Sequence, residues 1–391
     1  MNRFKQIDIL RAIAVFLVLG RHMTSCPSDS SGFLHQVTRI WAQGGWIGVD
    51  LFFVLSGFLV SGLLFREHEK FQELHIGHFL IRRGFKIYPP FWLLIGFTVI
   101  VLTLRHQPFP LRGLVSELFF VQNYGASIWG HTWSLAVEEH FYLLLAFGFY
   151  MLTKCRPAQP FTLIPAAFIA IALLSLILRI FWASQSAYDH KTHLFPSHLR
   201  LDGLFFGVLL SYWFHRHPIE FLSIAQRFRH LLAGIGMLLL SPAFCFQLER
   251  TPFIYTYGLI LFYVGSGCLL VSALSWKLPN AGIGSVVAYI GSHSYSVYLW
   301  HIPVASWGTP LIRRVLSEHN NWYTYAVTYL LGSIAFGVSL AILTEFPILR
   351  IRDRLFPSRG TALSSEATGL MRCSPGPRAP VAIERARGPG R

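Results

Sequence analysis

Residues 10–23 read LRAIAVFLVLGRHM, an apolar stretch that carries Arg11 near its start and His22 near its end. An apolar stretch of about 17–25 residues can cross a bilayer as one helix. Similar stretches recur as far as residue 346, and 53% of all residues are hydrophobic while only 13% are charged. Soluble proteins carry about 25% charged residues. The sequence therefore predicts a polytopic integral membrane protein of the all-α class.

We expect about ten transmembrane helices in one bundle, because backbone polar groups within a bilayer must be satisfied inside the protein. The connections are short, so residues 1–350 are assigned to one transmembrane domain. Residues 351–391, rich in Pro, Gly, Ser and Arg, are expected to form a disordered, basic cytoplasmic tail. The expected spans are 8–25, 46–65, 87–105, 134–153, 161–183, 202–214, 230–247, 253–274, 286–306 and 323–346.

The formal net charge of +15 reports membrane orientation rather than a nucleic-acid-binding surface. With the N-terminus inside, the inner side receives about twice as many Lys and Arg residues as the outer side. An even number of spans then places both termini in the cytoplasm. No cleavable signal peptide is evident. The five cysteines form no CxxC pair, so we expect neither a disulfide nor a metal site.

Arg11 and His22 share one face of the first span. Eleven residues return to within about 20° of the same direction and rise by about 16 Å. This places Arg11 in the inner half and His22 toward the outer surface. The alternative is that Arg11 extends to the inner headgroups while His22 caps the outer helix end.

Other ionisable residues are expected at the level of His22, near the outer ends of four further spans. Ionisable groups at membrane depth are costly and usually pair or face a polar cavity, so we expect a cavity here. Alternatively, Asp50 forms a structural pair with Arg200 or Arg21, and one of two adjacent glutamates faces headgroups. The residues in question are Asp50, Glu138, Glu139, Arg200, Asp202 and His301.

The densest basic segment is FLIRRGFKIYPPFW, residues 79–92. Arg83 and Lys86 are three residues apart, so on a helical turn they would point the same way and bracket a polyphosphate, with Arg82 nearby. Because Pro ends or kinks a helix, the Tyr-Pro-Pro that follows predicts a corner of defined shape. The alternative is that these basic residues only fix the orientation in the membrane.

Small residues recur at intervals of four or five along residues 52–64, FFVLSGFLVSGLL. They are Ser56, Gly57, Ser61 and Gly62, and such spacing lets helices approach closely in lipid. We expect them to serve helix packing, although a serine hydroxyl at this spacing could also line the cavity.

Together these segments resemble the membrane-bound acyltransferase-3 family, bacterial proteins that O-acylate glycans and related hydroxylated products. The matching segments occur in family order from residue 7 to about residue 350. They are the Arg-x10-His of Arg11 and His22, GVDLFFVLSGF, RRGFKIYPP, WSLAVEEHFY, RLDGLFFG and YSVYLWHIP. The resemblance implies a bundle of about ten helices that passes an acyl group, commonly acetyl, from cytoplasmic acyl-CoA to an extracytoplasmic acceptor.

The resemblance assigns function to Arg11, His22, Asp50, Arg83 and one glutamate of the VEE segment. The family's basic motif commonly reads Arg-x-x-Arg, whereas Lys86 holds the second position here. A side chain that can contact a phosphate through two hydrogen bonds is thus replaced by one that acts as a point charge. Some members also carry a C-terminal extracytoplasmic esterase-like domain. After residue 350 this chain shows none, so transfer is expected to finish in the membrane domain or with a partner protein.

The mechanistic hypothesis places the CoA phosphates on Arg82, Arg83 and Lys86, with the pantetheine passing Arg11 to reach His22. His22 would act as general base on an acceptor hydroxyl, oriented by Asp50 or by a glutamate. Arg200 or His301 would donate to the oxyanion, and Asp202 would help bind the acceptor. Direct transfer and a ping-pong route through acylated His22 both remain open.

The expected function is O-acylation, with acetyl the most plausible group, of a glycan such as O-antigen or exopolysaccharide at the bacterial inner membrane. Acyl-CoA is expected as a co-substrate, with no permanently bound cofactor. The runner-up is a proton-coupled transporter or flippase of a glycan precursor, in which the buried ionisable groups form a proton relay. A non-catalytic membrane scaffold is the third alternative.

Overall fold

The computed structural model describes residues 4–29, 31–156, 158–276, 278, 281–315 and 321–358. This part of the chain is built from helices and contains no β-strand, which confirms the all-α class. The described residues from Lys5 to Ser358 belong to one compact unit. The expected tail boundary at residue 350 falls within a helix that ends at Leu355, and residues 359–391 lie outside the described residues.

Long helices dominate the first half of the unit. They are α1 (Lys5–His22), α2 (Gly32–Gly44), η1 (Gly45–Ile47), α3 (Gly48–Phe71), α4 (Ile76–Leu104), α5 (Leu111–Leu118), η2 (Gly130–Thr132), α6 (Trp133–Cys155) and α7 (Ile164–Gln185).

Shorter helices and π-helical turns alternate in the second half. They are α8 (His190–His193), η3 (Ser197–Leu199), α9 (Leu201–Arg216), α10 (Pro218–Arg227), α11 (Arg229–Leu240), α12 (Pro242–Cys245), η4 (Ile254–Gly258), α13 (Leu259–Leu274), α14 (Ile283–Ser292), α15 (Ser294–Pro303), η5 (Val304–Gly308), α16 (Thr309–Val315), α17 (Trp322–Leu340), η7 (Ala341–Glu345) and α18 (Phe346–Leu355).

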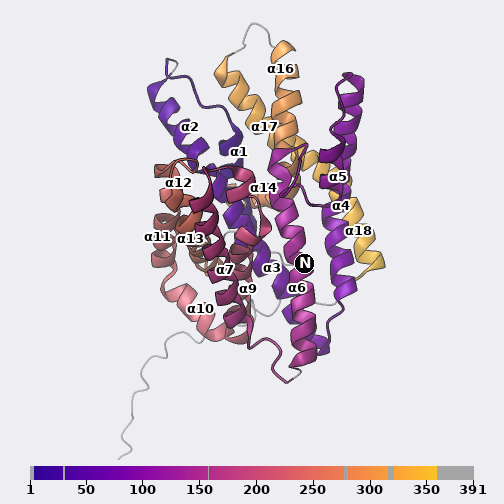
Figure 1. Cartoon of the computed structure of the whole chain (residues 1–391), viewed down its shortest axis with the longest axis vertical. Coiled ribbons are helices and arrows are strands. Elements are labelled where there is room, and N and C mark those ends of the chain that lie inside the picture. The colour runs from indigo at the N-terminus through magenta and orange to yellow at the C-terminus, as the bar shows by residue number, and fades with distance from the viewer. Residues whose placement is uncertain are drawn as a thin grey trace, which may run out of the picture. The chain divides into compact units, whose positions relative to one another are not determined.

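Helix α3 lies in the middle of the bundle, behind α6 and α9 in the view of Figure 1. It is buried along most of its length and packs on α9, α1, α13 and α6. The close approach to α9 depends on Gly57, because a Cβ there would lie 1.9 Å from the carbonyl oxygen of Leu204. The expected packing role of this small-residue segment is therefore confirmed at Gly57.

Six helical stretches of the described chain are long and apolar enough to cross a membrane, or seven if the bent pair from Pro218 to Cys245 is one span. Helix α1 carries Lys5, Asp8, Arg11 and Arg21 within its 18 residues, and α9 has only 16 residues, so neither meets the same criterion. The count of about ten spans stays a prediction.

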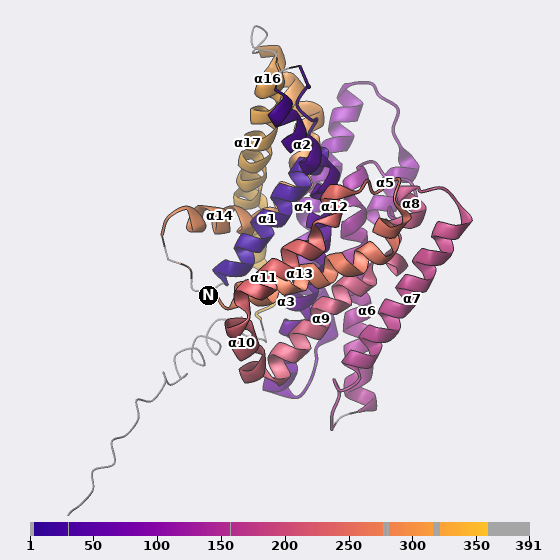
Figure 2. The same ribbon diagram turned by 90° about the vertical axis from the view of Figure 1, so that its left-hand side faces the viewer.

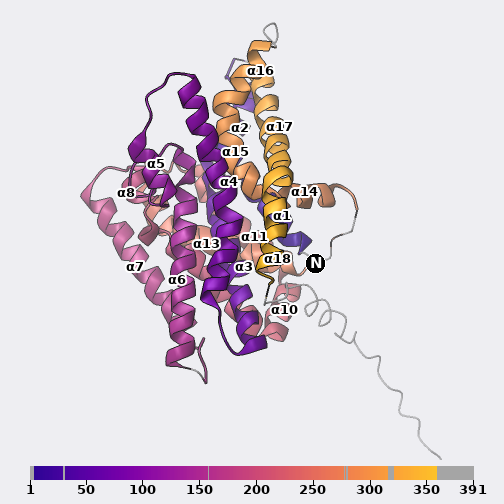
Figure 3. The ribbon, with the colours of Figure 1, turned by 90° about the vertical axis from the view of Figure 1, so that its right-hand side faces the viewer.

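The ninth expected span, 286–306, is divided in the structure. Helix α14 ends at Ser292 and α15 begins at Ser294. Helix α14 packs on α1 and projects sideways from the bundle, as Figures 2 and 3 show. Only α15 lies among the helices that bound the candidate site.

Helix α4 continues through Pro89 and Pro90, where the sequence predicts a corner. Two adjacent prolines remove two backbone donors, so the carbonyls of Phe85 and Lys86 have no N–H partner four residues later. The hydroxyl of Tyr295 donates to the carbonyl of Ile87 at 2.8 Å, in the same turn. The basic segment is therefore part of a long helix rather than a loop.

Candidate active site

The first cavity lies among α1, α3, α4, α6 and α15 and has an empty volume of about 810 Å³. Its apolar wall includes Phe52, Phe53, Leu59 and Val60. The charged residues that line it are Arg11, Arg83, Lys86 and Glu138. Three cations against one carboxylate give an excess of positive charge, which suits an anionic ligand.

Arg83 and Lys86 both reach the first cavity, as residues three apart on one helix face should. The Arg83 Nε atom is buried without a hydrogen-bond partner. Arg82 has other partners: its guanidinium donates to Oδ1 of Asp353 at 2.9 Å and to the carbonyl of Phe356. The structure therefore brings together two of the three basic residues in this segment.

Arg11 joins the same cavity from α1, and its Nε donates to the hydroxyl of Ser294 at 3.1 Å. His22, eleven residues later, lines a second cavity. Helix α1 thus contributes Arg11 to the first cavity and both Arg21 and His22 to the second.

Glu138 and Glu139 lie near the basic residues of α4. The sequence predicts instead that both glutamates lie at the level of His22. Glu138 lines the first cavity and accepts a hydrogen bond from Tyr142 at 2.9 Å. Glu139 accepts a hydrogen bond from Tyr88 of α4. Because Glu138 is five residues beyond the start of α6, it lies about 8 Å along the helix from that end.

The second cavity has an empty volume of about 1050 Å³. Histidine, arginine and aromatic side chains line much of it. These are Arg21, His22, Trp46, His131, Trp133, His190, Phe195, Arg200 and Tyr298. This mixture of flat aromatic surfaces and hydrogen-bonding groups suits a ligand with both apolar faces and polar edges.

An ion pair lies beside the second cavity. Arg21 donates to Oε1 of Glu249 at 2.7 Å, and Nε2 of His190 lies 3.9 Å from the same oxygen. Burial, and then the charge of Arg21, lowers the pKa of His190 below its usual value of 6.5. His190 is therefore mainly neutral at neutral pH.

Three imidazole rings come together beside this cavity: His22 and His131 line it, and His301 is buried behind them and lines neither cavity. The ring centroids of His22 and His301 are 4.9 Å apart, and those of His301 and His131 are 5.0 Å apart. Nδ1 of His301 contacts the carbonyl of Tyr298, and because a carbonyl only accepts, Nδ1 carries the proton. In a neutral ring, Nε2 of His301 is then an acceptor.

This assignment determines the proton position on His22. Its Nδ1 lies 3.0 Å from the carbonyl of Val18 and 3.1 Å from Nε2 of His301, so Nδ1 is the donor to both. Nε2 of His22 is left unprotonated in the neutral ring. A histidine with an unprotonated ring nitrogen at a cavity wall has the form required of a general base.

Val49 of α3 and Tyr298 of α15 line both cavities, so we call this pair the shared wall. The hydroxyl of Tyr298 donates to the carbonyl of His131 and lies 2.6 Å from the hydroxyl of Ser134. The cation-lined first cavity and the histidine-lined second cavity therefore adjoin at the shared wall.

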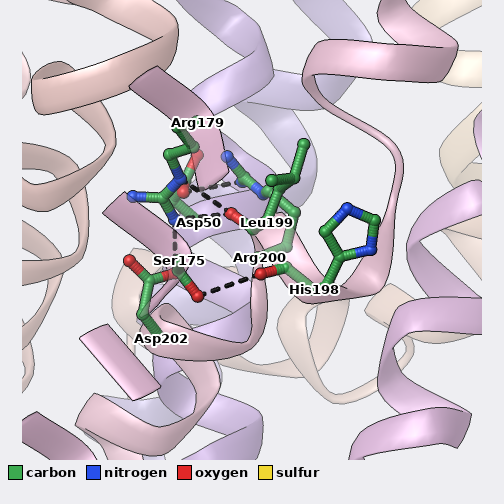
Figure 4. Close-up of polar contacts among 7 residues, drawn as sticks. All are labelled: Asp50, Ser175, Arg179, His198, Leu199, Arg200 and Asp202. Carbon is green, nitrogen blue, oxygen red and sulfur yellow. Dashed lines mark hydrogen bonds and ion pairs between the residues drawn. The ribbon is translucent and has the colours of Figure 1, made fainter. Parts of the chain in front are cut away.

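Figure 4 shows two buried ion pairs close to the second cavity. Arg200 donates to Oδ1 of Asp50 at 2.7 Å, and Arg179 of α7 pairs with Asp202 of α9. Arg179 also donates to the carbonyl of Leu199 at 2.8 and 2.6 Å. It thereby holds the turn that precedes Arg200. The structural pairing of Asp50 with Arg200, one of the two alternatives from the sequence, is present.

Arg200 keeps unused donors although it is almost completely buried. Its Nε and one terminal nitrogen make no hydrogen bond, and the guanidinium lies over the rings of Phe53 and Trp133 at 5.5 and 5.7 Å. Because Arg200 lines the second cavity, these donors are candidates for contact with a ligand oxygen. Asp202 pairs with Arg179 and does not line either cavity.

The sequence alone predicts no role for two residues near the site, Arg179 and His131. Arg179 is a lone charged residue in an apolar span. Charged residues are rare in such spans and usually face the protein interior, so this residue could have been identified from the sequence. On α7 only Ile164, Ser175 and Arg179 are buried, so a polar strip faces the protein interior. His131 lies just before the fourth expected span.

No group of three or more His, Cys, Asp or Glu side chains able to hold a metal ion occurs among the described residues. The clustered imidazoles instead contact one another and backbone carbonyls.

Comparison with known proteins shows similarity over most of the chain. The family described as an acyltransferase domain, the acyltransferase-3 type, matches residues 4–343. Peptidoglycan O-acetyltransferase OatA of Listeria monocytogenes is 28% identical over 84% of the chain and 54% of its own length. The Bacillus subtilis protein named "Putative peptidoglycan O-acetyltransferase YrhL" is 27% identical over 78% of the chain and 49% of its own length.

The chain thus spans about half the length of the curated relatives it matches. No solved structure matches it.

Proposed function

The chain belongs to the membrane-bound acyltransferase-3 family, and from this premise we propose that it transfers an acetyl group from acetyl-CoA to a hydroxyl of a cell-surface glycan. Peptidoglycan is the first acceptor to test, because relatives carry that name. O-antigen and exopolysaccharide are the next acceptors to test.

One observation carries this proposal: a cavity rich in cations adjoins a cavity lined by histidine and aromatic residues. The cations of the first cavity suit the phosphates of a donor that carries phosphates at one end and a thioester at the other. An acceptor sugar fits the second, since aromatic faces stack on sugar rings and polar groups bind hydroxyls.

In the first cavity, Arg83 and Lys86 would bind the CoA phosphates, and Arg11 would lie alongside the pantetheine. The planar guanidinium of Arg83 suits a bidentate phosphate contact, whereas Lys86 acts as a point charge. Arg82 is left out of this proposal because Asp353 and Phe356 occupy its donors. Glu138 and Tyr142 would position the pantetheine amides from the opposite wall.

The proposed chemistry centres on Nε2 of His22. This nitrogen takes the proton of the acceptor hydroxyl as the hydroxyl oxygen attacks the thioester carbonyl carbon. The new C–O bond forms, the C–S bond breaks, and the CoA thiolate takes the proton from His22. His301 orients His22, and the free donors of Arg200 stabilise the negative oxygen, with Asp50 holding Arg200 in place.

A ping-pong variant would place the acetyl group on His22 before the acceptor arrives. An acetylated enzyme that accumulates without acceptor and is lost in His22→Ala would favour that variant. Its absence from an active preparation would favour direct transfer.

We propose that the protein lies in a bacterial cytoplasmic membrane with both termini in the cytoplasm, so that the first cavity opens toward cytoplasmic acetyl-CoA. The bias in Lys and Arg supports this orientation. Family membership does not favour the transporter alternative.

Mass spectrometry of surface glycans would test the function in cells that express wild type or His22→Ala. A mass increase of one acetyl group is expected with wild type alone. His22→Ala should still bind acetyl-CoA, because the phosphate-binding residues lie in the other cavity. Equal acetylation by both proteins would overturn the role of His22, and loss of CoA binding in His22→Ala would overturn the division between the cavities.

A further inference from the structure

The shared wall of Val49 and Tyr298 lies between the proposed phosphate site and His22. Arg83 and Lys86 line only the first cavity, and His22 lines only the second. A donor held at both ends would therefore have its thioester at the wall. The acyl group, rather than the nucleotide, is the part that must pass between these two side chains.

Tyr298 forms a fixed side of this passage. Its hydroxyl bonds to the His131 carbonyl and the Ser134 hydroxyl, and its ring packs edge-on to Phe52 with centroids 6.2 Å apart. These contacts come from three different segments, so rotation of the ring would break several at once.

Val49 forms the other side and is also held firmly. It lies in the first turn of α3, next to Asp50, whose carboxylate is bound to Arg200. The preceding Gly48 packs directly on α1, because a Cβ there would lie 2.3 Å from the carbonyl oxygen of Ala14. The backbone of this turn therefore cannot move toward α1 without a clash, and the valine side chain lies where the two cavities meet.

We propose that Val49 and Tyr298 select the acyl group by size, so that acetyl passes to His22 while longer acyl groups are retained in the first cavity. This inference rests on the proposed acetyltransferase function. The apolar wall of the first cavity, including Leu59 and Val60, offers a surface on which a longer acyl chain would be retained. Longer acyl-CoA thioesters should therefore bind but transfer poorly, which lowers kcat rather than raising KM.

The test uses membranes that contain the full chain and its native glycan, supplied with equal concentrations of acetyl-, propionyl- and butyryl-CoA. Mass spectrometry measures the ratio of butyryl to acetyl groups on the glycan. Val49→Ala should raise this ratio by about tenfold, because one methylene in an apolar pocket changes selectivity by about 10- to 200-fold. Val49→Ile should lower the propionyl-to-acetyl ratio.

Two matched truncations serve as controls. Val54→Ala removes the same atoms from the same helix at a buried position that lines neither cavity, so the donor ratio should not change. Val60→Ala enlarges only the first cavity and should shift the ratio less than Val49→Ala does. Thermal unfolding confirms that each variant is folded, and Val49→Ile remains informative if Val49→Ala does not fold.

An unchanged ratio in both Val49 variants, with wild type active, would overturn the size selection and leave the proposed function intact. An equal shift in Val60→Ala would assign selection to the whole first cavity instead and would also overturn it. If wild type transferred no acyl group from any CoA thioester, the proposed function itself would fail, and the size selection with it.

Discussion

Arg82 and Arg83 are neighbours in α4 with different surroundings, which makes them a matched pair for mutation. Arg83 lines the first cavity, while Arg82 bonds to Asp353 and Phe356. We expect Arg83→Ala to raise KM for acetyl-CoA by about 10- to 100-fold, the usual loss for a charge-assisted hydrogen bond. Arg82→Ala should change KM by less than about threefold, because Arg82 lines neither cavity and an ion pair with a half-exposed carboxylate contributes little.

Steady-state kinetics with varied acetyl-CoA concentration would measure KM for Arg83→Ala and for Arg82→Ala. Equal increases in KM for the two variants would contradict the assignment of Arg83 to the donor site.

Glu117 of α5 is expected to make the stability of the protein depend on pH. Its Oε1 accepts hydrogen bonds from the backbone N–H of Ile128 and Trp129 and from the hydroxyl of Thr132. Burial raises the pKa of Glu117 to about 7, and these hydrogen bonds oppose that rise only in part. The folded protein therefore binds the Glu117 proton more tightly than the unfolded chain does.

The sign of the pH dependence follows from linkage. The stabilisation from protonated Glu117 is complete below its unfolded pKa of about 4.5 and is lost as the pH rises through 7. Melting temperature should thus fall between pH 5 and pH 8 in wild type. The fall should be smaller in Glu117→Gln, whose side-chain oxygen can accept the same hydrogen bonds without a charge. Identical pH profiles for the two proteins would contradict the raised pKa.

At the residue scale, the sequence identifies which span carries each ionisable residue better than it identifies which neighbouring helix the side chain faces. Arg11 and Arg83 line one cavity, as the expected layout requires, whereas the pairing of Asp50 with Arg200 is the structural alternative to the role expected for Asp50. Glu138 does not group with His22 as expected, because helical spacing alone does not say which neighbouring helix a side chain faces. Arg179 and His131 gain their importance from contacts made by distant segments.

At the scale of elements, the contact between α3 and α9 depends on the absence of side chains. A Cβ at Gly57 would lie 1.9 Å from the Leu204 carbonyl, and one at Gly207 would lie 2.3 Å from the Val54 carbonyl. We expect Gly57→Ala to push the two helices apart and to destabilise the protein by about 1–3 kcal/mol, as overpacking does. Thermal unfolding in detergent would measure the loss.

Gly96 of α4 is the matched control, because a Cβ there would meet nothing within 4 Å. Gly96→Ala should leave the melting temperature unchanged or raise it, since Ala is the better helix former. A similar loss in both variants would contradict close packing as the cause of the effect at Gly57, because a Cβ at Gly96 has no neighbour to clash with.

Most elements could be predicted because long apolar stretches are strong signals. The expected span 134–153 corresponds closely to α6, and 202–214 to α9. The break between α14 and α15 and the continuation of α4 through two prolines could not be predicted. Tertiary contacts stabilise both features. Helix α14 packs on α1, and Tyr295 donates to a carbonyl in the proline-containing turn of α4.

At the scale of the whole molecule, the two cavities imply a defined direction of transfer. If the first cavity opens to the cytoplasm, sealed inside-out vesicles should acetylate glycan from added radioactive acetyl-CoA, whereas right-side-out vesicles should not. Labelled glycan on a filter would measure transfer. Permeabilised vesicles of both kinds are the control and should be equally active, and activity in sealed right-side-out vesicles alone would contradict the proposed orientation.

The shared wall has a consequence for the cell's energy supply. Bacteria store energy as a proton gradient across the cytoplasmic membrane, and a continuous water-filled passage would discharge it. Two cavities that adjoin within one chain come close to such a passage, and Val49 and Tyr298 lie where they meet. If the aperture is no wider than an acetyl group, as we propose, it would pass that group while keeping the water columns apart, and electrical insulation would then limit the size of the acyl group that the protein can evolve to transfer.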